Sequence, residues 1–142
     1  MKNILSLIAL MIVCTTAGAQ QLSKEMTIAL KNNDPAALSQ LVDDSNKDEC
    51  LVVGKRKSTL LQLAVQMNST KTGKYLLETA EVDVNKTCGD LTPLMYAAKF
   101  GHVEMVKLLV DNGADSSIVV DGKTAASIVS KYKKDEILAL LK

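Results

Sequence analysis

The stretch Thr92–Asp115, TPLMYAAKFGHVEMVKLLVDNGAD, predicts two short amphipathic helices separated by a glycine. Thr92 is a favourable N-cap, and Pro93 suits the first position of a helix. Gly101 is expected to end the first helix and Asn112-Gly113 the second. Helices of about nine residues are marginal alone, so this pair needs neighbours against which to bury its apolar faces.

A similar pattern recurs before and after this stretch. Thr59-Leu60-Leu61 stands 33 residues ahead of Thr92-Pro93-Leu94, and Thr124-Ala125-Ala126 begins 32 residues after Thr92. A more divergent copy is expected near the N-terminus, with its turn between helices at residues 32–34. A constant period of this kind is typical of repeat architectures, in which each unit packs on the next.

The central stretch resembles an ankyrin repeat, a family with a period of about 33 residues and a Thr-Pro-Leu-His opening. Besides Thr-Pro-Leu, the matching positions are Ala97-Ala98, Gly101-His102, Leu108-Leu109 and Gly113-Ala114-Asp115, whereas Met95 stands in place of the His. In the family that His helps to tie the helix start to its neighbour. Because Met95 replaces this His, the resemblance implies that this repeat lacks part of the polar tie. The members that the chain resembles are of the small exported bacterial type.

The resemblance implies an all-α fold: an ankyrin-repeat solenoid of about four helix-turn-helix units with projecting β-hairpin fingers. All units belong to one domain, 20–142, and they are expected at 22–50 (N-terminal cap), 54–86, 87–119 and 120–142 (C-terminal cap). The fingers are expected at 43–58, 83–91 and 116–123. Atypical first and last units are expected because they must cover the ends of the stack.

Residues 1–19 are predicted to be a cleaved signal peptide. Lys2 gives a positive start, residues 4–13 form an apolar run too short to span a membrane, and Ala17-Gly18-Ala19 is a small-residue cleavage signal. Cys14 leaves lipidation as an alternative, although Val13 is larger than the residue that precedes a lipidated cysteine. We therefore expect a periplasmic or secreted protein without a membrane span.

Composition and motifs favour a folded domain without catalytic chemistry. The hydrophobic content is 47% and the formal charge is +1, so bulk charge does not point to nucleic acid. His102 is the only histidine, and its place at a helix start favours a structural role. Lys55 follows a glycine as in a phosphate loop, but Glu49 stands where that motif needs another glycine. No enzyme activity, cofactor or metal is expected.

Two cysteines, Cys50 and Cys88, follow the predicted leader and fall in adjacent fingers. In an oxidising compartment a disulfide between them is the favoured interpretation, and the two positions are 38 residues apart. A pair of inert thiols and a redox or metal role are the alternatives.

The resemblance also places the candidate binding surface on the concave face, at the ends of the first helices and on the fingers. The candidate partner-binding residues are Lys31, Asn32, Lys55, Arg56, Gln66, Met67, Leu91, Lys99, Phe100, Lys131 and Tyr132. Lysine leads in three of the four helix positions, and a large apolar or aromatic residue follows in the last three. This pattern predicts a basic, aromatic-edged groove for a protein with an acidic surface, and a solvated face is the alternative.

Together these features predict a monomeric, non-catalytic protein-protein interaction module of the periplasm or exterior. The alternative function is a dedicated stabilising or inhibitory subunit that caps a single partner enzyme. A binding module should capture several partners and a dedicated subunit only one.

Overall fold

The computed structural model describes residues 20–142, so the predicted signal peptide lies outside the described residues. Three helix pairs follow one another: α1 (Lys24–Lys31) with α2 (Pro35–Ser39), α3 (Leu60–Gln66) with α4 (Thr70–Glu78), and α5 (Pro93–Phe100) with α6 (Val103–Asp111). Two 3-10 turns, η1 (Ala126–Ile128) and η2 (Lys131–Lys133), then lead into α7 (Lys134–Leu140).

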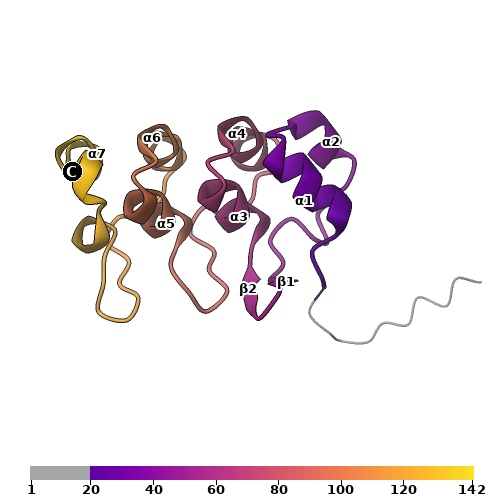
Figure 1. Cartoon of the computed structure of the whole chain (residues 1–142), viewed down its shortest axis with the longest axis horizontal. Coiled ribbons are helices and arrows are strands. Elements are labelled where there is room, and N and C mark those ends of the chain that lie inside the picture. The colour runs from indigo at the N-terminus through magenta and orange to yellow at the C-terminus, as the bar shows by residue number, and fades with distance from the viewer. Residues whose placement is uncertain (1–19) are drawn as a thin grey trace, which may run out of the picture.

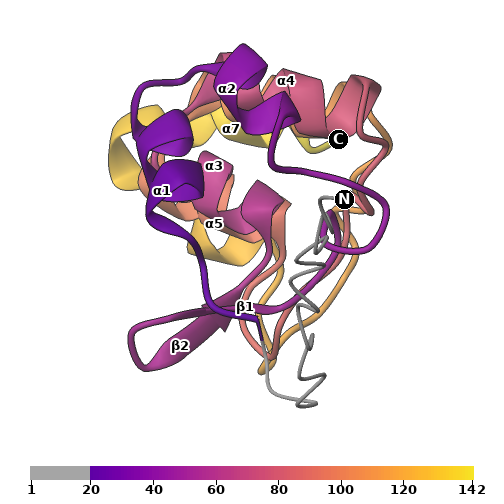
Figure 2. The same ribbon diagram turned by 90° about the vertical axis from the view of Figure 1, so that its right-hand side faces the viewer.

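The helix pairs lie side by side in one row, and the loops that join them project from the same edge (Figure 1). Viewed along the row, α1, α3 and α5 line up in one layer, and α2, α4 and α7 lie in a second layer (Figure 2). Neighbouring pairs touch in both layers, since α3 contacts α5 and α4 contacts α6. Each pair therefore buries its apolar faces against its neighbours, as the short predicted helices require.

Hydroxyl side chains fix the start of the first helix in each pair. Ser23, Thr59 and Thr92 each accept a hydrogen bond from the backbone N–H three residues further on. Such a bond satisfies one of the N–H groups that have no partner within the helix. Pro93 follows at the first helical position, where a missing N–H costs nothing. The predicted start of α5 is confirmed.

The turn inside each pair uses one residue in the left-handed conformation. Gly101 takes this place after α5 (φ 74°), and Asn33 (φ 52°) and Asn68 (φ 53°) take it in the earlier pairs. In all three turns the next N–H donates to the carbonyl of an alanine inside the first helix, at 2.8 to 3.0 Å. Asparagine tolerates this conformation better than other residues with a side chain, so it can stand in the earlier pairs where glycine stands after α5.

Only the first finger contains paired strands within residues 20–142. Its strands β1 (Leu51–Val53) and β2 (Arg56–Ser58) are antiparallel, with Val53 opposite Arg56. The third finger has a single bridge, between Val120 and Lys123, and the second has turns. The prediction of β-hairpins was therefore too regular for these two fingers, which contain turns or a single bridge in place of paired strands.

The segment after Thr124 also departs from the expected helix pair. Ala125 is buried, but the residues after it form the 3-10 turn η1 rather than an α-helix. Val129 and Ser130 leave the helical region, with ψ of 136° and 134°. The N–H of Ser130 instead donates to the carbonyl of Ala98, at 2.9 Å, in the preceding pair. β-Branched and hydroxyl residues are weak helix formers, so this contact prevails over helix propagation.

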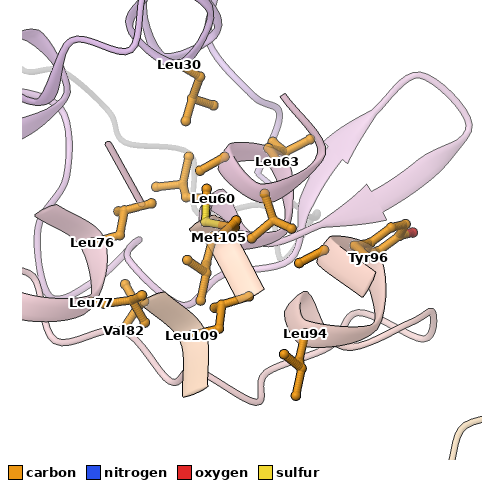
Figure 3. Close-up of a cluster of buried hydrophobic side chains, with 14 of the residues drawn as sticks. Leu30, Leu60, Leu63, Leu76, Leu77, Val82, Leu94, Tyr96, Met105 and Leu109 are labelled. Carbon is orange, nitrogen blue, oxygen red and sulfur yellow. The ribbon is translucent and has the colours of Figure 1, made fainter. Parts of the chain in front are cut away.

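Aliphatic side chains from both layers form a continuous core. Leu60, Leu76, Met105 and Leu109 are completely buried and lie among the side chains drawn in Figure 3. Ile137 in α7 is also completely buried, so the core continues to the last helix. Leu109, one of the positions that match the repeat pattern, thus belongs to the core.

A buried glutamine supplies the polar tie between two adjacent units. Gln62 occupies the position that Met95 has in the next repeat, and its Nε2 donates to the carbonyl of Leu91 at 2.8 Å. Its Oε1 also accepts a hydrogen bond from the N–H of Thr59, at 2.7 Å. Met95 cannot donate such a bond and lies buried in the core. Gln62 of the second repeat therefore makes the polar tie, whereas apolar packing of Met95 takes its place in the third repeat.

Candidate partner-binding surface

The predicted binding residues lie at the ends of the first helices, in η2 and in the fingers; we call this set the ladder. Its exposed members are Lys31, Asn32, Lys55, Arg56, Met67, Lys99, Phe100, Lys131 and Tyr132, while Gln66 and Leu91 are half-buried. Leu91 packs against the core, so it offers the least surface. The β1–β2 hairpin projects below the layer of first helices in Figure 2.

The three large apolar ladder residues differ in how firmly they are held. Met67 is 37% exposed and Phe100 is 46% exposed, whereas Tyr132 is 96% exposed. Val129 and Ser130, which precede Tyr132, have non-helical backbone conformations, and the Tyr132 side chain extends into solvent. An interface anchor needs a fixed position before the partner arrives, so Phe100 is the strongest candidate.

Phe100 is seated against three neighbouring side chains. Its ring stacks on Tyr96, with centroids 6.0 Å apart and planes 12° apart, and the His102 ring lies tilted at 5.8 Å. The ammonium of Lys99 lies 5.8 Å from the centroid of the Phe100 ring, within the range of a cation-π contact. Aromatic pairs at such separations attract each other beyond simple burial. The exposed ring is therefore held in place by the helix that carries it.

A hydrogen bond to Asp90 fixes the tyrosine beneath this ring. The Tyr96 hydroxyl donates to Asp90 Oδ2 at 2.6 Å, and this bond is the main reason that the pKa of Asp90 lies below its usual value. The charges of Arg56 and Lys99 lower the pKa of Asp90 further. Burial, and then the bond to Asp90, raise the pKa of Tyr96 to about 12. Asp90 is thus ionised, and Tyr96 keeps its proton, across the physiological range.

The basic side chains of the ladder have no salt-bridge partner among the described residues; they are Lys31, Lys55, Arg56, Lys99 and Lys131. On the second helices two lysines are paired. Lys74 pairs with Glu78 at 3.8 Å, and Lys107 pairs with Asp111 at 2.7 Å. Although the chain as a whole is nearly neutral, five cations that have no salt-bridge partner among the described residues stand on the ladder, where they can attract an acidic surface.

The two cysteines bring adjacent fingers together. The sulfurs of Cys50 and Cys88 lie at disulfide-bonding distance, and their Cα atoms are 5.6 Å apart, which is ordinary for a bridged pair. The N–H of Asp83 also donates to Asp48 Oδ1 at 2.8 Å, nearby along both loops. The first and second fingers are therefore joined at more than one point.

His102 is half-buried at the start of α6, with its ring beside Phe100. Burial lowers its pKa below the usual value, and the backbone carbonyl of Gln66 acts in the opposite direction. Within residues 20–142 no three His, Cys, Asp or Glu side chains stand close enough together to hold a metal ion. In the same part of the chain, every helix is too short or too polar to cross a membrane.

Sequence reasoning did not include Asp90 and Tyr96 in the surface. The sequence could have indicated Tyr96, because it precedes Phe100 by four residues and side chains with this spacing meet on one helix face. Asp90 gave no signal, because its contact with Tyr96 depends on how the second finger folds back onto α5.

Comparisons with known proteins identify the repeats. A family model described as ankyrin repeats (3 copies) matches residues 26–120. The chain is 31% identical over 98 residues to glycerophosphocholine phosphodiesterase GDE1 of Candida albicans, and 31% identical over 103 residues to putative ankyrin repeat protein R96 of Acanthamoeba polyphaga mimivirus. These matches cover 68% and 71% of this chain but only 8% and 10% of those relatives.

The structure is similar to that of the human ASB11 ankyrin repeat domain. The TM-score is 0.71 at 25% sequence identity, and the match covers 87% of this chain and 57% of that one. Ankyrin repeats generally mediate protein-protein interaction and are typically non-catalytic. With the family model spanning most of the described residues and the helix pairs stacked as these repeats are, the chain belongs to the ankyrin-repeat family.

Proposed function

We propose that this chain is a non-catalytic module that holds another protein against the ladder and the finger tips. Phe100 carries the proposal, because it is an exposed aromatic ring seated on buried Tyr96. The ammonium of Lys99, which has no salt-bridge partner among the described residues, lies 5.8 Å from its centroid. Aromatic anchors ringed by polar groups are typical of protein interfaces. In this proposal, 22–50 and 120–142 cap the ends of a four-unit solenoid.

The proposed partner presents an acidic surface. Charge complementarity of this kind steers association and selects partners more than it adds affinity. The binding protein itself is proposed to act as a monomer, in which the helix pairs form a single row (Figure 1).

Photo-crosslinking in living cells tests this function. A photoreactive amino acid in place of Met67 or Phe100 is expected to give discrete adducts with another protein. The same amino acid in place of Lys74 or Lys107, on the second helices, is the control and is expected to give none. Several adducts indicate a module with several partners, and a single adduct indicates a dedicated subunit. Adducts of equal yield from both faces, or none from the ladder, would contradict the proposed surface.

Export is the second part of the proposal, and it rests on the sequence of residues 1–19. We expect the purified exported chain to begin at Gln20 and to carry no lipid, because Ala17-Gly18-Ala19 precedes that residue. Intact-mass measurement of the exported fraction checks this. A full-length mass, or a lipid adduct on Cys14, would show that the leader has been misinterpreted.

A further inference from the structure

The segment 88–91 in the second finger is attached to the preceding unit at both ends. At one end Cys88 is joined to Cys50. At the other end the carbonyl of Leu91 accepts the hydrogen bond from completely buried Gln62. Asp90 lies between these two attachments, so its carboxylate has a fixed place relative to the first finger.

Asp90 in turn holds Tyr96, on which Phe100 stacks. Besides the bond from Tyr96, its Oδ1 accepts a hydrogen bond from the N–H of Leu91 at 2.7 Å, so both carboxylate oxygens are occupied. Tyr96 is 4% exposed, and Figure 3 shows its ring pointing away from the buried leucines with the hydroxyl outermost. Phe100 stacks on that ring. The attachments of 88–91 therefore determine where the exposed Phe100 ring is supported.

The same crosslink brings a cation from the first finger to this place. Arg56 lies in β2, and the paired strand β1 begins at Leu51, immediately after Cys50. Arg56 stands opposite Val53, three residues from Cys50, and Asp90 stands two residues from Cys88, so the crosslink limits how far apart these two charges can lie. The Lys99 ammonium lies 5.8 Å from the centroid of the Phe100 ring. A second cation, Arg56, comes from the preceding unit.

We propose that Arg56, Lys99 and Phe100 form one recognition subsite for a carboxylate side chain that stands beside a large apolar side chain in the partner, and that the attachments of 88–91 to the first finger assemble it. This inference rests on the proposed function and adds the class of ligand and the means of assembly. In this proposal the ladder is more than a row of similar positions, because it contains one composite site whose residues come from two repeats.

The chemistry of the subsite selects this ligand. Arg56 and Lys99 form no salt bridge among the described residues, so their donors can meet a partner. A guanidinium binds a carboxylate through two parallel hydrogen bonds, and an ammonium adds a point charge. The 46% exposed Phe100 ring offers the apolar contact beside them. Asp90 offsets one of the two positive charges, so a single carboxylate matches the subsite.

The assembly is tested by NMR without any partner. Phe100 is the only phenylalanine in the chain, so ¹³C-labelled phenylalanine gives one set of ring signals. We expect those signals to move toward the solvent-exposed positions in Cys50→Ser/Cys88→Ser and in Gln62→Met, each of which removes one attachment. Gln62→Met keeps the side-chain volume and introduces the residue that the next repeat carries, so its helical circular dichroism is expected to survive. Lys107→Gln, on α6, is the control and should leave the signals in place.

Unchanged Phe100 signals in a folded variant of either kind would overturn the assembly. Should the double serine variant lose its helical circular dichroism, the Gln62→Met variant alone decides, because it leaves the crosslink intact.

The ligand class is tested with synthetic peptides that carry one tryptophan between two glutamates in a Gly-Ser spacer. Fluorescence anisotropy measures their binding to the chain from Gln20 onward. We expect the affinity to fall about tenfold or more when the glutamates become glutamine, when the tryptophan becomes alanine, or when the protein carries Arg56→Gln. Lys107→Gln should leave the affinity unchanged.

The outcomes separate this inference from the proposed function. Equal affinity for the glutamate and glutamine peptides overturns the ligand class, even where crosslinks from Met67 still form. Discrimination between the peptides supports the subsite, and it does so whether or not those crosslinks identify the natural partner.

Discussion

Replacing Leu109 by alanine is expected to lower the free energy of unfolding by about 2 to 5 kcal/mol. Leu109 is completely buried in α6, and α6 contacts the helices on both of its sides, α4 and α7. The cavity would therefore weaken two interfaces between units. Because stability in a repeat array depends on such nearest-neighbour interfaces, the loss should spread beyond one pair. Chemical denaturation followed by circular dichroism measures the change.

Val119→Ala is the matched control for this substitution. Val119 is an aliphatic residue in the third finger and is 62% exposed, so truncating it should change stability by no more than about 0.5 kcal/mol. A shift below about 1 kcal/mol for Leu109→Ala would mean that the second helices do not form the assigned core.

The Cys50→Ser/Cys88→Ser variant is expected to be less stable by about 4 kcal/mol than the oxidised protein. The two residues are 38 apart in sequence, and a crosslink that closes a loop of this size restricts the unfolded chain by about that amount. The fold itself should survive at low temperature, because the core and the tie from Gln62 do not involve the cysteines. Denaturation of the oxidised protein, the reduced protein and the variant measures the difference.

The reduced protein is the internal control, since it should match the serine variant. If oxidised and reduced protein unfold at the same denaturant concentration, the crosslink does not form in solution, and the alternative of two inert thiols holds.

Most of the helical framework could be predicted from the sequence because its signals are local. Thr92 and Pro93 define a helix start within four residues, and Gly101 needs no distant contact to adopt a positive φ. The 33-residue spacing then extends the assignment to the second repeat. Asn68 shows the limit, because its role equals that of Gly101 although the sequence lacks the Gly-His pair there.

Features that depend on contacts between units could not be predicted in the same way. The 3-10 turn after Ala125 arises where the N–H of Ser130 finds an acceptor in the preceding pair. Likewise, the support of Phe100 requires Asp90, which reaches Tyr96 only after the second finger has folded. Sequence therefore located the ladder residues one by one, whereas the structure shows which of them are held together.

Charge reversal on the ladder tests the central claim, that this surface binds an acidic partner. Lys99→Glu/Lys131→Glu should slow association with the crosslinked partner and reduce its dependence on salt, because the lost contribution is electrostatic steering. Lys74→Glu/Lys107→Glu changes the net charge equally but on the second helices, and it should leave association unchanged. Association rates are measured at two salt concentrations, with circular dichroism confirming the fold. Slower association for the ladder variant alone is the predicted result, and equal rates for both variants would contradict the account.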